Sequence, residues 1–119
     1  ALLEPSMQLR AEPGLFLAGQ IVGMEGYMAS TASGLVAGLN VARLLEGRTP
    51  LIFPITTMIG ALCGYVSSPL VIDFQPMKPN FGLLPEIDQP LRKADKRGAL
   101  RARALADLEA FMAAEMVEG

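Results

Sequence analysis

The stretch Leu15-Phe16-Leu17-Ala18-Gly19-Gln20-Ile21-Val22-Gly23-Met24-Glu25-Gly26-Tyr27 decides how the fold of this chain is read. Leu15 to Ala18 is a short apolar run between Pro13-Gly14 and Gly19, which predicts a buried strand of a parallel sheet. Glycines then recur up to the start of a helical pattern at Met28. A strand, a glycine turn and a helix start in succession predict an α/β fold whose backbone approaches a flat or phosphorylated ligand.

The length and composition restrict the possible functions. A chain of 119 residues is short for a domain that wraps a dinucleotide, and no basic, then apolar, leader pattern opens it, so we expect the C-terminal piece of a larger polypeptide whose remainder lies upstream. There is no His and one Cys, which leaves no disulfide framework, no imidazole to act as base or metal ligand and no thiolate metal cluster. We expect a reducing, cytoplasmic location. The net charge of −2 does not by itself indicate a nucleic-acid binder.

Two uncharged stretches raise the question of a membrane. Residues 49–72 are long enough to span a bilayer, but Pro50, Pro54 and Pro69 divide them. Residues 26–42 contain several hydroxyl residues, an asparagine and three glycines, which make them less apolar than a typical membrane-spanning helix. We therefore expect buried helices and no membrane insertion.

Pro and Gly divide the chain into segments. A helix is predicted from Met28 to Glu46, closed by Gly47, and a second from Thr57 to Ser67, ended by Pro69. Residues 73–90 hold four prolines and are predicted to be an irregular crossover. Leu91 to Val117 has the pattern of a long helix with an apolar stripe. The expected divisions are thus 1–72, 73–90 and 91–119.

Three longer motifs give a more specific indication. They are Ala18 to Tyr27, Ser33 to Gly38, and the run Phe74-Gln75-Pro76-Met77-Lys78-Pro79-Asn80-Phe81-Gly82-Leu83-Leu84-Pro85. In order and spacing they closely resemble the C-terminal region of the folate- and FAD-dependent tRNA (uracil-5-)-methyltransferase family. The resemblance covers roughly residues 3 to 85. The glycine fingerprint that holds the FAD pyrophosphate in that family is not in this chain.

The resemblance implies the C-terminal part of a Rossmann-like FAD-binding domain, followed by further helices. It implies a flavoenzyme that methylates C5 of a T-loop uridine in tRNA, with methylenetetrahydrofolate as carbon donor, reduced FAD as electron source and NAD(P)H behind it. Cysteines that act at the uracil or flavin are expected upstream. The expected FAD-binding residues are Gly19, Gln20, Gly23, Glu25, Gly26, Tyr27 and Met28, with the helix start stabilising charge at flavin N1 and O2.

Several residues keep two interpretations. Glu25 either orients a nearby group or takes part in proton transfer, or it is an ordinary capping carboxylate near a helix start. Asn80 and Phe81 are expected to bind folate or uridine, whereas the rest of their segment fits a structural crossover. Cys63, in mid-helix without a cationic neighbour, is expected to be a buried small hydrophobe. A group of cations either contacts tRNA phosphates or forms a solvated face: Lys78, Arg92, Lys93, Lys96 and Arg97.

Two other classes of function remain open. Another FAD-dependent oxidoreductase would share the Gly19 to Tyr27 run but is not expected to share Phe74 to Pro85. A non-enzymatic interaction module would use the charged helix Leu91 to Val117 to dock on a partner.

Overall fold

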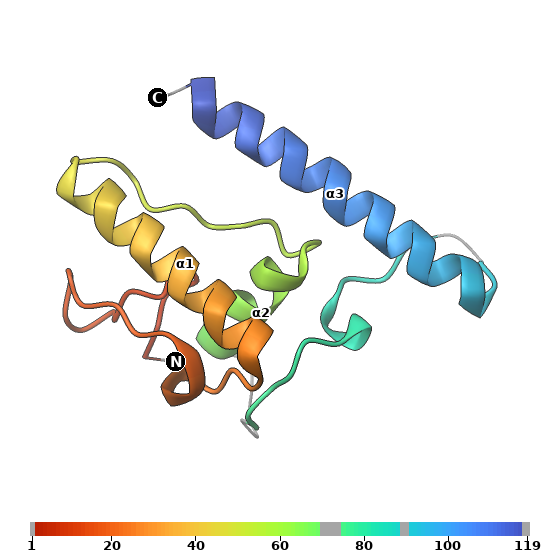
Figure 1. The fold of residues 1–119 in the computed structure, drawn as a ribbon, viewed down its shortest axis with the longest axis horizontal. Helices are drawn as coiled ribbons and strands as arrows, with labels where there is room; N and C mark the ends of the chain where they lie inside the picture. Colours follow the sequence, from red (N-terminus) through yellow and green to blue (C-terminus); the bar gives the residue numbers. More distant parts are fainter. Residues whose placement is uncertain (1, 70–74, 89–90, 118–119) are drawn as a thin grey trace.

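The computed structural model describes residues 2–69, 75–88 and 91–117, with side chains to residue 115 in the last helix. The described residues form three α-helices, α1 (Tyr27–Leu45), α2 (Met58–Ser67) and α3 (Lys93–Val117). Two short 3-10 helices, η1 (Gly19–Val22) and η2 (Phe81–Leu83), precede α1 and α3. Figure 1 shows α1 and α2 crossing near the N-terminal segment, with α3 extended along the outside.

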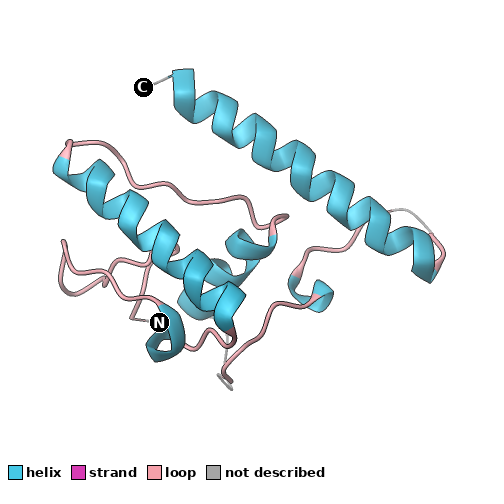
Figure 2. Cartoon of the chain, viewed as in Figure 1, coloured by secondary structure: helices cyan, strands magenta, loops and turns pink. Residues whose placement is uncertain are grey.

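The predicted buried strand at Leu15 to Ala18 is not found. Among the described residues only isolated bridges occur, and Phe16 pairs antiparallel with Gln8 (Figure 2). Leu15 is 48% exposed, so this run is not fully buried either. A parallel strand needs neighbouring strands, whereas the neighbours of Leu15 and Leu17 here are the backbone groups of Leu9 and Met7, from the same N-terminal segment.

Helix α1 begins and ends where the sequence predicts, to within one residue. Gly47 follows it with a φ of 73°, the left-handed conformation that suits a glycine after a helix. On its buried face, Asn40 is fully buried. The Asn40 side chain donates to the carbonyls of Ser6 and Leu51, both at 3.0 Å, and accepts from the Leu51 N–H at 2.6 Å. These bonds join the N-terminal segment and the segment after α1 to one helix.

Helix α2 is capped by Thr57, whose hydroxyl accepts from the Gly60 N–H at 3.1 Å and donates to the Pro54 carbonyl at 2.6 Å. A Cβ at Gly60 would lie 1.9 Å from the Pro54 carbonyl oxygen, so this position requires glycine because of close approach. Leu62 and Cys63, each 2% exposed, belong to the main hydrophobic core with Val36 of α1.

Helix α3 is attached along its length. Leu100 packs in a second small core with Ala61 and Leu84, and the rings of Phe53 and Phe111 lie 5.1 Å apart. The expected apolar stripe of α3 is only partly buried, because Leu105 and Met112 are 52% and 51% exposed. The helix covers the segment between α1 and α2 rather than the core itself, which leaves one edge of the stripe open.

Candidate functional site

The glycine turn is built as the sequence predicts, from residues in the left-handed region. Gly19, Gly23 and Gly26 have φ values of 81°, 95° and 91°, which side chains other than glycine rarely adopt. The Gly19 N–H donates to Ser33 Oγ at 2.8 Å, and that hydroxyl donates to the Ser30 carbonyl at 2.8 Å. Ser33 is fully buried. Helix α1 therefore holds the turn through a hydroxyl group that water does not reach.

The start of α1 is free to receive a ligand. Gly26 is its N-cap, and no side chain caps it. The backbone N–H groups of Gly26, Tyr27, Met28 and Ala29 have no acceptor among the described residues. Because an uncapped helix N-terminus carries partial positive charge, this end of α1 favours an anionic or electron-rich group.

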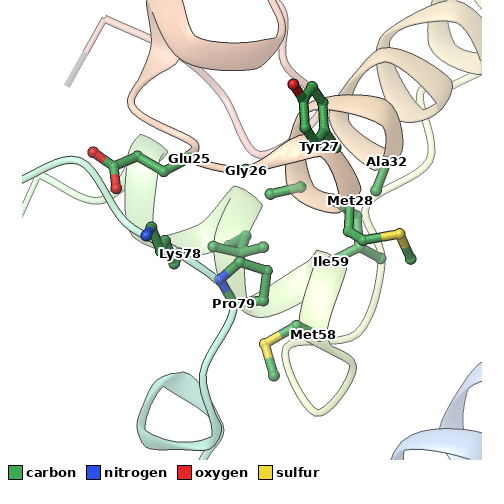
Figure 3. Close-up of a pocket in the computed structure, with 11 residues that line it drawn as sticks. Glu25, Gly26, Tyr27, Met28, Ala32, Met58, Ile59, Lys78 and Pro79 are labelled. Atoms are coloured by element: carbon green, nitrogen blue, oxygen red, sulfur yellow. The ribbon is translucent and has the colours of Figure 1, made fainter.

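The third of the three motifs, the one that contains Met77, lies directly against this turn. The Glu25 N–H donates to the Met77 carbonyl at 2.9 Å, and the Met77 N–H donates to the Gly23 carbonyl at 2.7 Å. This parallel bridge between Met24 and Met77 places Lys78 and Pro79 beside Glu25 and Gly26 (Figure 3). Two sequence motifs about fifty residues apart therefore form one surface.

Two pockets adjoin the turn and share Glu25, Gly26, Tyr27 and Lys78. The first, of about 690 Å³, has apolar walls from Met28 at the start of α1 and from α2. Figure 3 shows Met58, Ile59 and Pro79 around its interior. The remaining lining residues are Ala29, Ala32 and Leu62. Its size and apolar character suit a flat ring system.

The second pocket, of about 660 Å³, is more polar. It is lined by Gly19, Gln20 and Ser30 together with the shared residues. The amide of Gln20 and the hydroxyl of Ser30 are neutral hydrogen-bonding groups, and Lys78 supplies a positive charge. This set suits the hydroxyl-bearing or phosphate part of a cofactor.

The structure brings six of the seven predicted cofactor-binding residues to these two pockets. Gly23 is the exception, since it is buried and its carbonyl accepts from Met77. Glu25 does not cap α1, so the interpretation of its carboxylate as a helix cap is wrong. Sequence reasoning missed Ser30 and the α2 residues. It gave Lys78 only as a contact for tRNA phosphates or as part of a solvated face, whereas Lys78 lines both pockets.

Asn80 and Phe81 line neither of the two pockets. The Asn80 side-chain amide donates to the Lys78 carbonyl at 3.0 Å and approaches Met77 Sδ at 3.4 Å, so it fixes the shape of the loop that carries Lys78. Phe81 lines a separate pocket at α3, where the Arg97 guanidinium lies 5.6 Å from the centre of its ring. The expectation that Asn80 and Phe81 bind folate or uridine therefore stays a prediction, for a surface next to the two pockets rather than inside them.

Cys63 lies in the interior of α2, away from both pockets. Burial raises the pKa of its thiol to about 12, which keeps it protonated at physiological pH. The expectation of a buried small hydrophobe is confirmed. By length and composition, helix α1 is long and apolar enough to cross a membrane, and 22% of its apolar stretch is buried.

The first comparison with known proteins gives a match to a broad protein family. Residues 1–49, which include the turn and all of α1, match the family described as glucose inhibited division protein A. This match covers the turn and the start of α1, but not the α2 residues, Lys78 and Pro79 that also line the pockets.

Individual proteins that are similar to this chain give a more specific indication than the family match. The chain is 48% identical over 92% of its length to the methylenetetrahydrofolate--tRNA-(uracil-5-)-methyltransferase TrmFO of Persephonella marina, and covers 25% of that protein. It is 52% identical over 95% of its length to the protein of the same name from Thermosynechococcus vestitus, again covering 25%. The protein from Synechococcus sp. (strain CC9311) is 52% identical over 91% of the chain, which covers 24% of it. The chain is similar to these methyltransferases over nearly its whole length, and it spans about a quarter of the length of these relatives.

Proposed function

We propose that this chain is part of a flavoenzyme that methylates C5 of a T-loop uridine in tRNA, with methylenetetrahydrofolate as carbon donor and reduced FAD as electron source. The observation that carries the proposal is the Met24 to Met77 bridge, which joins two motifs of the family over one pair of pockets. The relatives' names supply the folate, the tRNA and the uracil. We further propose that NAD(P)H reduces the FAD, that the enzyme is cytoplasmic and not membrane-inserted, and that the rest of the polypeptide lies upstream and completes a Rossmann-like sheet.

The residues present fit a flavin. A Cβ at Gly26 would meet no atom of the chain within 4 Å, so the space beside this backbone is open for a ligand. The free N–H groups at the start of α1 are donors suited to flavin N1 and O2, and Met28, Met58 and Ile59 offer an apolar surface to the rings. When bound, FAD supplies the reducing electrons of the reaction. In this proposal Gly19, Gln20 and Ser30 hold its polar chain.

Lys78 and Glu25 are the charged residues shared by both pockets. We propose that the Lys78 ammonium adds to the positive potential of the α1 N-terminus and so favours the anionic reduced form of the flavin. Glu25, on the same side of the pocket in Figure 3, is the candidate in this chain for holding or passing a proton. Asn80 would act by positioning Lys78, and Phe81 would act on the substrate side.

The proposal is tested with Gly26→Val in the full-length protein. A branched side chain at a φ of 91° is strained, and it would occupy the space assigned to the flavin. We expect most bound FAD to be lost, measured as flavin absorbance per folded protein, together with methylation of a tRNA transcript. Gly34→Ala is the matched control, because its Cβ also meets no atom within 4 Å but lies on the exposed side of α1. Full FAD occupancy in folded Gly26→Val would contradict the site.

Lys78→Gln tests the electrostatic part. Removing the positive charge is expected to lower the flavin reduction potential by tens of millivolts. The reason is that a loss of ~1.4 kcal/mol in the stabilisation of the reduced flavin corresponds to about 60 mV for one electron. FAD content is expected to stay near normal. A potential equal to that of the wild type would remove Lys78 from the flavin site and favour a purely structural role for its loop.

Asn80→Ala separates the two interpretations of the third motif, a structural loop that positions Lys78 and a surface that binds substrate. Since the Asn80 amide bonds the Lys78 carbonyl, its loss is expected to reproduce part of the Lys78→Gln shift in potential and to slow methylation by on the order of tenfold. An unchanged potential with a raised KM for folate would instead place Asn80 against the substrate.

The alternative function, another FAD-dependent oxidoreductase, is distinguished by flavin reduction without any methylation of tRNA.

A further inference from the structure

The charges of α3 are divided between its two halves. Six of the ten Lys and Arg residues of the chain, but only one of the twelve acidic residues, lie in the segment 91–103. The basic residues are Arg92, Lys93, Lys96, Arg97, Arg101 and Arg103. In a chain of net charge −2, this segment therefore carries a strong positive charge.

The acidic half of α3 is used within the molecule. Glu115 forms an ion pair with Arg43 at 3.0 Å, and Asp107 accepts from the Thr56 hydroxyl at 2.6 Å. In the basic half, Arg103 donates to the carbonyls of Pro85 and Glu86. The other five cations are exposed, and their side chains make no hydrogen bond or ion pair with any described residue. We call these five the basic face: Arg92, Lys93, Lys96, Arg97 and Arg101.

Helix stability does not explain the basic face. Positive charges near a helix N-terminus oppose the partial positive charge already there, and only Asp95 in the first turn offsets it. A helix arranged for its own stability would carry its cations at the other end. The basic face is therefore better explained by a negatively charged partner.

An aromatic pocket adjoins the basic face. Phe81 is 44% exposed, and the Arg97 guanidinium lies 5.6 Å from its ring centre. The pocket, of about 370 Å³, also includes Gly98 and Arg101. A Cβ at Gly98 would meet no atom within 4 Å, so no packing within this chain requires a glycine in mid-helix. An exposed aromatic ring beside free arginines is the combination that binds single-stranded nucleic acid by stacking and phosphate contacts.

We propose that the basic face and Phe81 bind a single-stranded segment of the tRNA substrate, with a base stacked on Phe81 and phosphates held by Arg97, Arg101 and the neighbouring lysines. This inference rests on the proposed function, since it takes its RNA from the methylation reaction. The surface is distinct from the two pockets at the glycine turn, which share no residue with it except Met58.

The test measures binding of a tRNA transcript to the full-length protein over a series of salt concentrations. Arg97→Gln with Arg101→Gln is expected to weaken binding by on the order of tenfold near 0.1 M salt, and to reduce the slope of log affinity against log salt by about 1.4, for two phosphates on a single strand. Arg10→Gln with Arg48→Gln is the matched control, since it removes the same charge away from the basic face. FAD content and kcat are expected to stay unchanged, with a raised KM for tRNA.

Phe81→Leu separates stacking from charge. It should weaken tRNA binding at least fivefold while leaving the salt slope as in the wild type. An equal loss of affinity in the Arg10 and Arg48 control would overturn the inference, as would unchanged tRNA binding in the Arg97 and Arg101 variant. If that variant keeps its tRNA affinity but loses binding to vesicles containing phosphatidylserine, the face is a membrane contact and the inference is wrong. A wild-type protein that holds FAD and yet neither binds nor methylates tRNA would overturn the proposed function as well.

Discussion

At the scale of single residues, buried polar groups decide stability more than the exposed ones do. Asn40 has no exposed surface and makes three hydrogen bonds to main-chain groups. Asn40→Ala would leave these groups without partners, and we expect a loss of ~2–4 kcal/mol in the free energy of unfolding. Denaturant unfolding of the full-length protein measures it. Asn80→Ala, at an exposed asparagine, serves as the comparison and should cost less than ~1 kcal/mol.

Cys63 gives a prediction that depends on pH. Its pKa is about 12 in the folded chain and 9.0 in the reference state, so the neutral thiol stabilises the fold below pH 9, and this contribution is lost as the pH rises from 9 toward 12. Cys63→Ala should cost ~1 kcal/mol or somewhat more at pH 7 and leave FAD content intact. Above pH 9 the wild type should lose stability more steeply than the variant. Parallel curves for the two proteins would contradict the burial of the thiol.

At the scale of elements, α2 depends on one close backbone contact. A Cβ at Gly60 would clash with the Pro54 carbonyl, whereas a Cβ at Gly64 would sit 3.7 Å from the Ile55 side chain. We expect Gly60→Ala to lower the thermal midpoint by several degrees or more, and Gly64→Ala to be neutral or stabilising through helix propensity, worth ~1 kcal/mol. Similar midpoints for the two variants would show that the segment before α2 moves freely.

The elements also show what a sequence can predict here. Gly47, Thr57 and Pro69 fix the ends of α1 and α2 by local chemistry, so these ends were predicted to within a residue. The run Leu15 to Ala18 was not, because an apolar run becomes a strand only where a partner strand exists. Lys78 joins the turn through the Met24 to Met77 bridge, and no local pattern reports a contact across about fifty residues.

At the scale of the whole molecule, α1 has a large uncovered side. Tyr27, Leu35 and Leu45 are 94%, 62% and 83% exposed, and the relatives are about four times longer than this chain. We expect the rest of the polypeptide to cover this side. Leu35→Glu should therefore destabilise the full-length protein by ~2 kcal/mol or more, through a buried charge. The same change should reduce self-association of the isolated chain, measured by light scattering. An unchanged free energy of unfolding in the full-length variant would show that this side stays open to water.

The bridge between Met24 and Met77 also sets an order of events during synthesis. Protein chains emerge from the ribosome N-terminus first, and the wall formed by Lys78 and Pro79 is made some fifty residues after the glycine turn. Until that later segment has emerged, the turn has only one side of its pocket. If the chain binds flavin as proposed, a nascent chain stalled before Met77 should therefore remain colourless in excess flavin, and the cofactor is captured only after the segment with Lys78 has emerged.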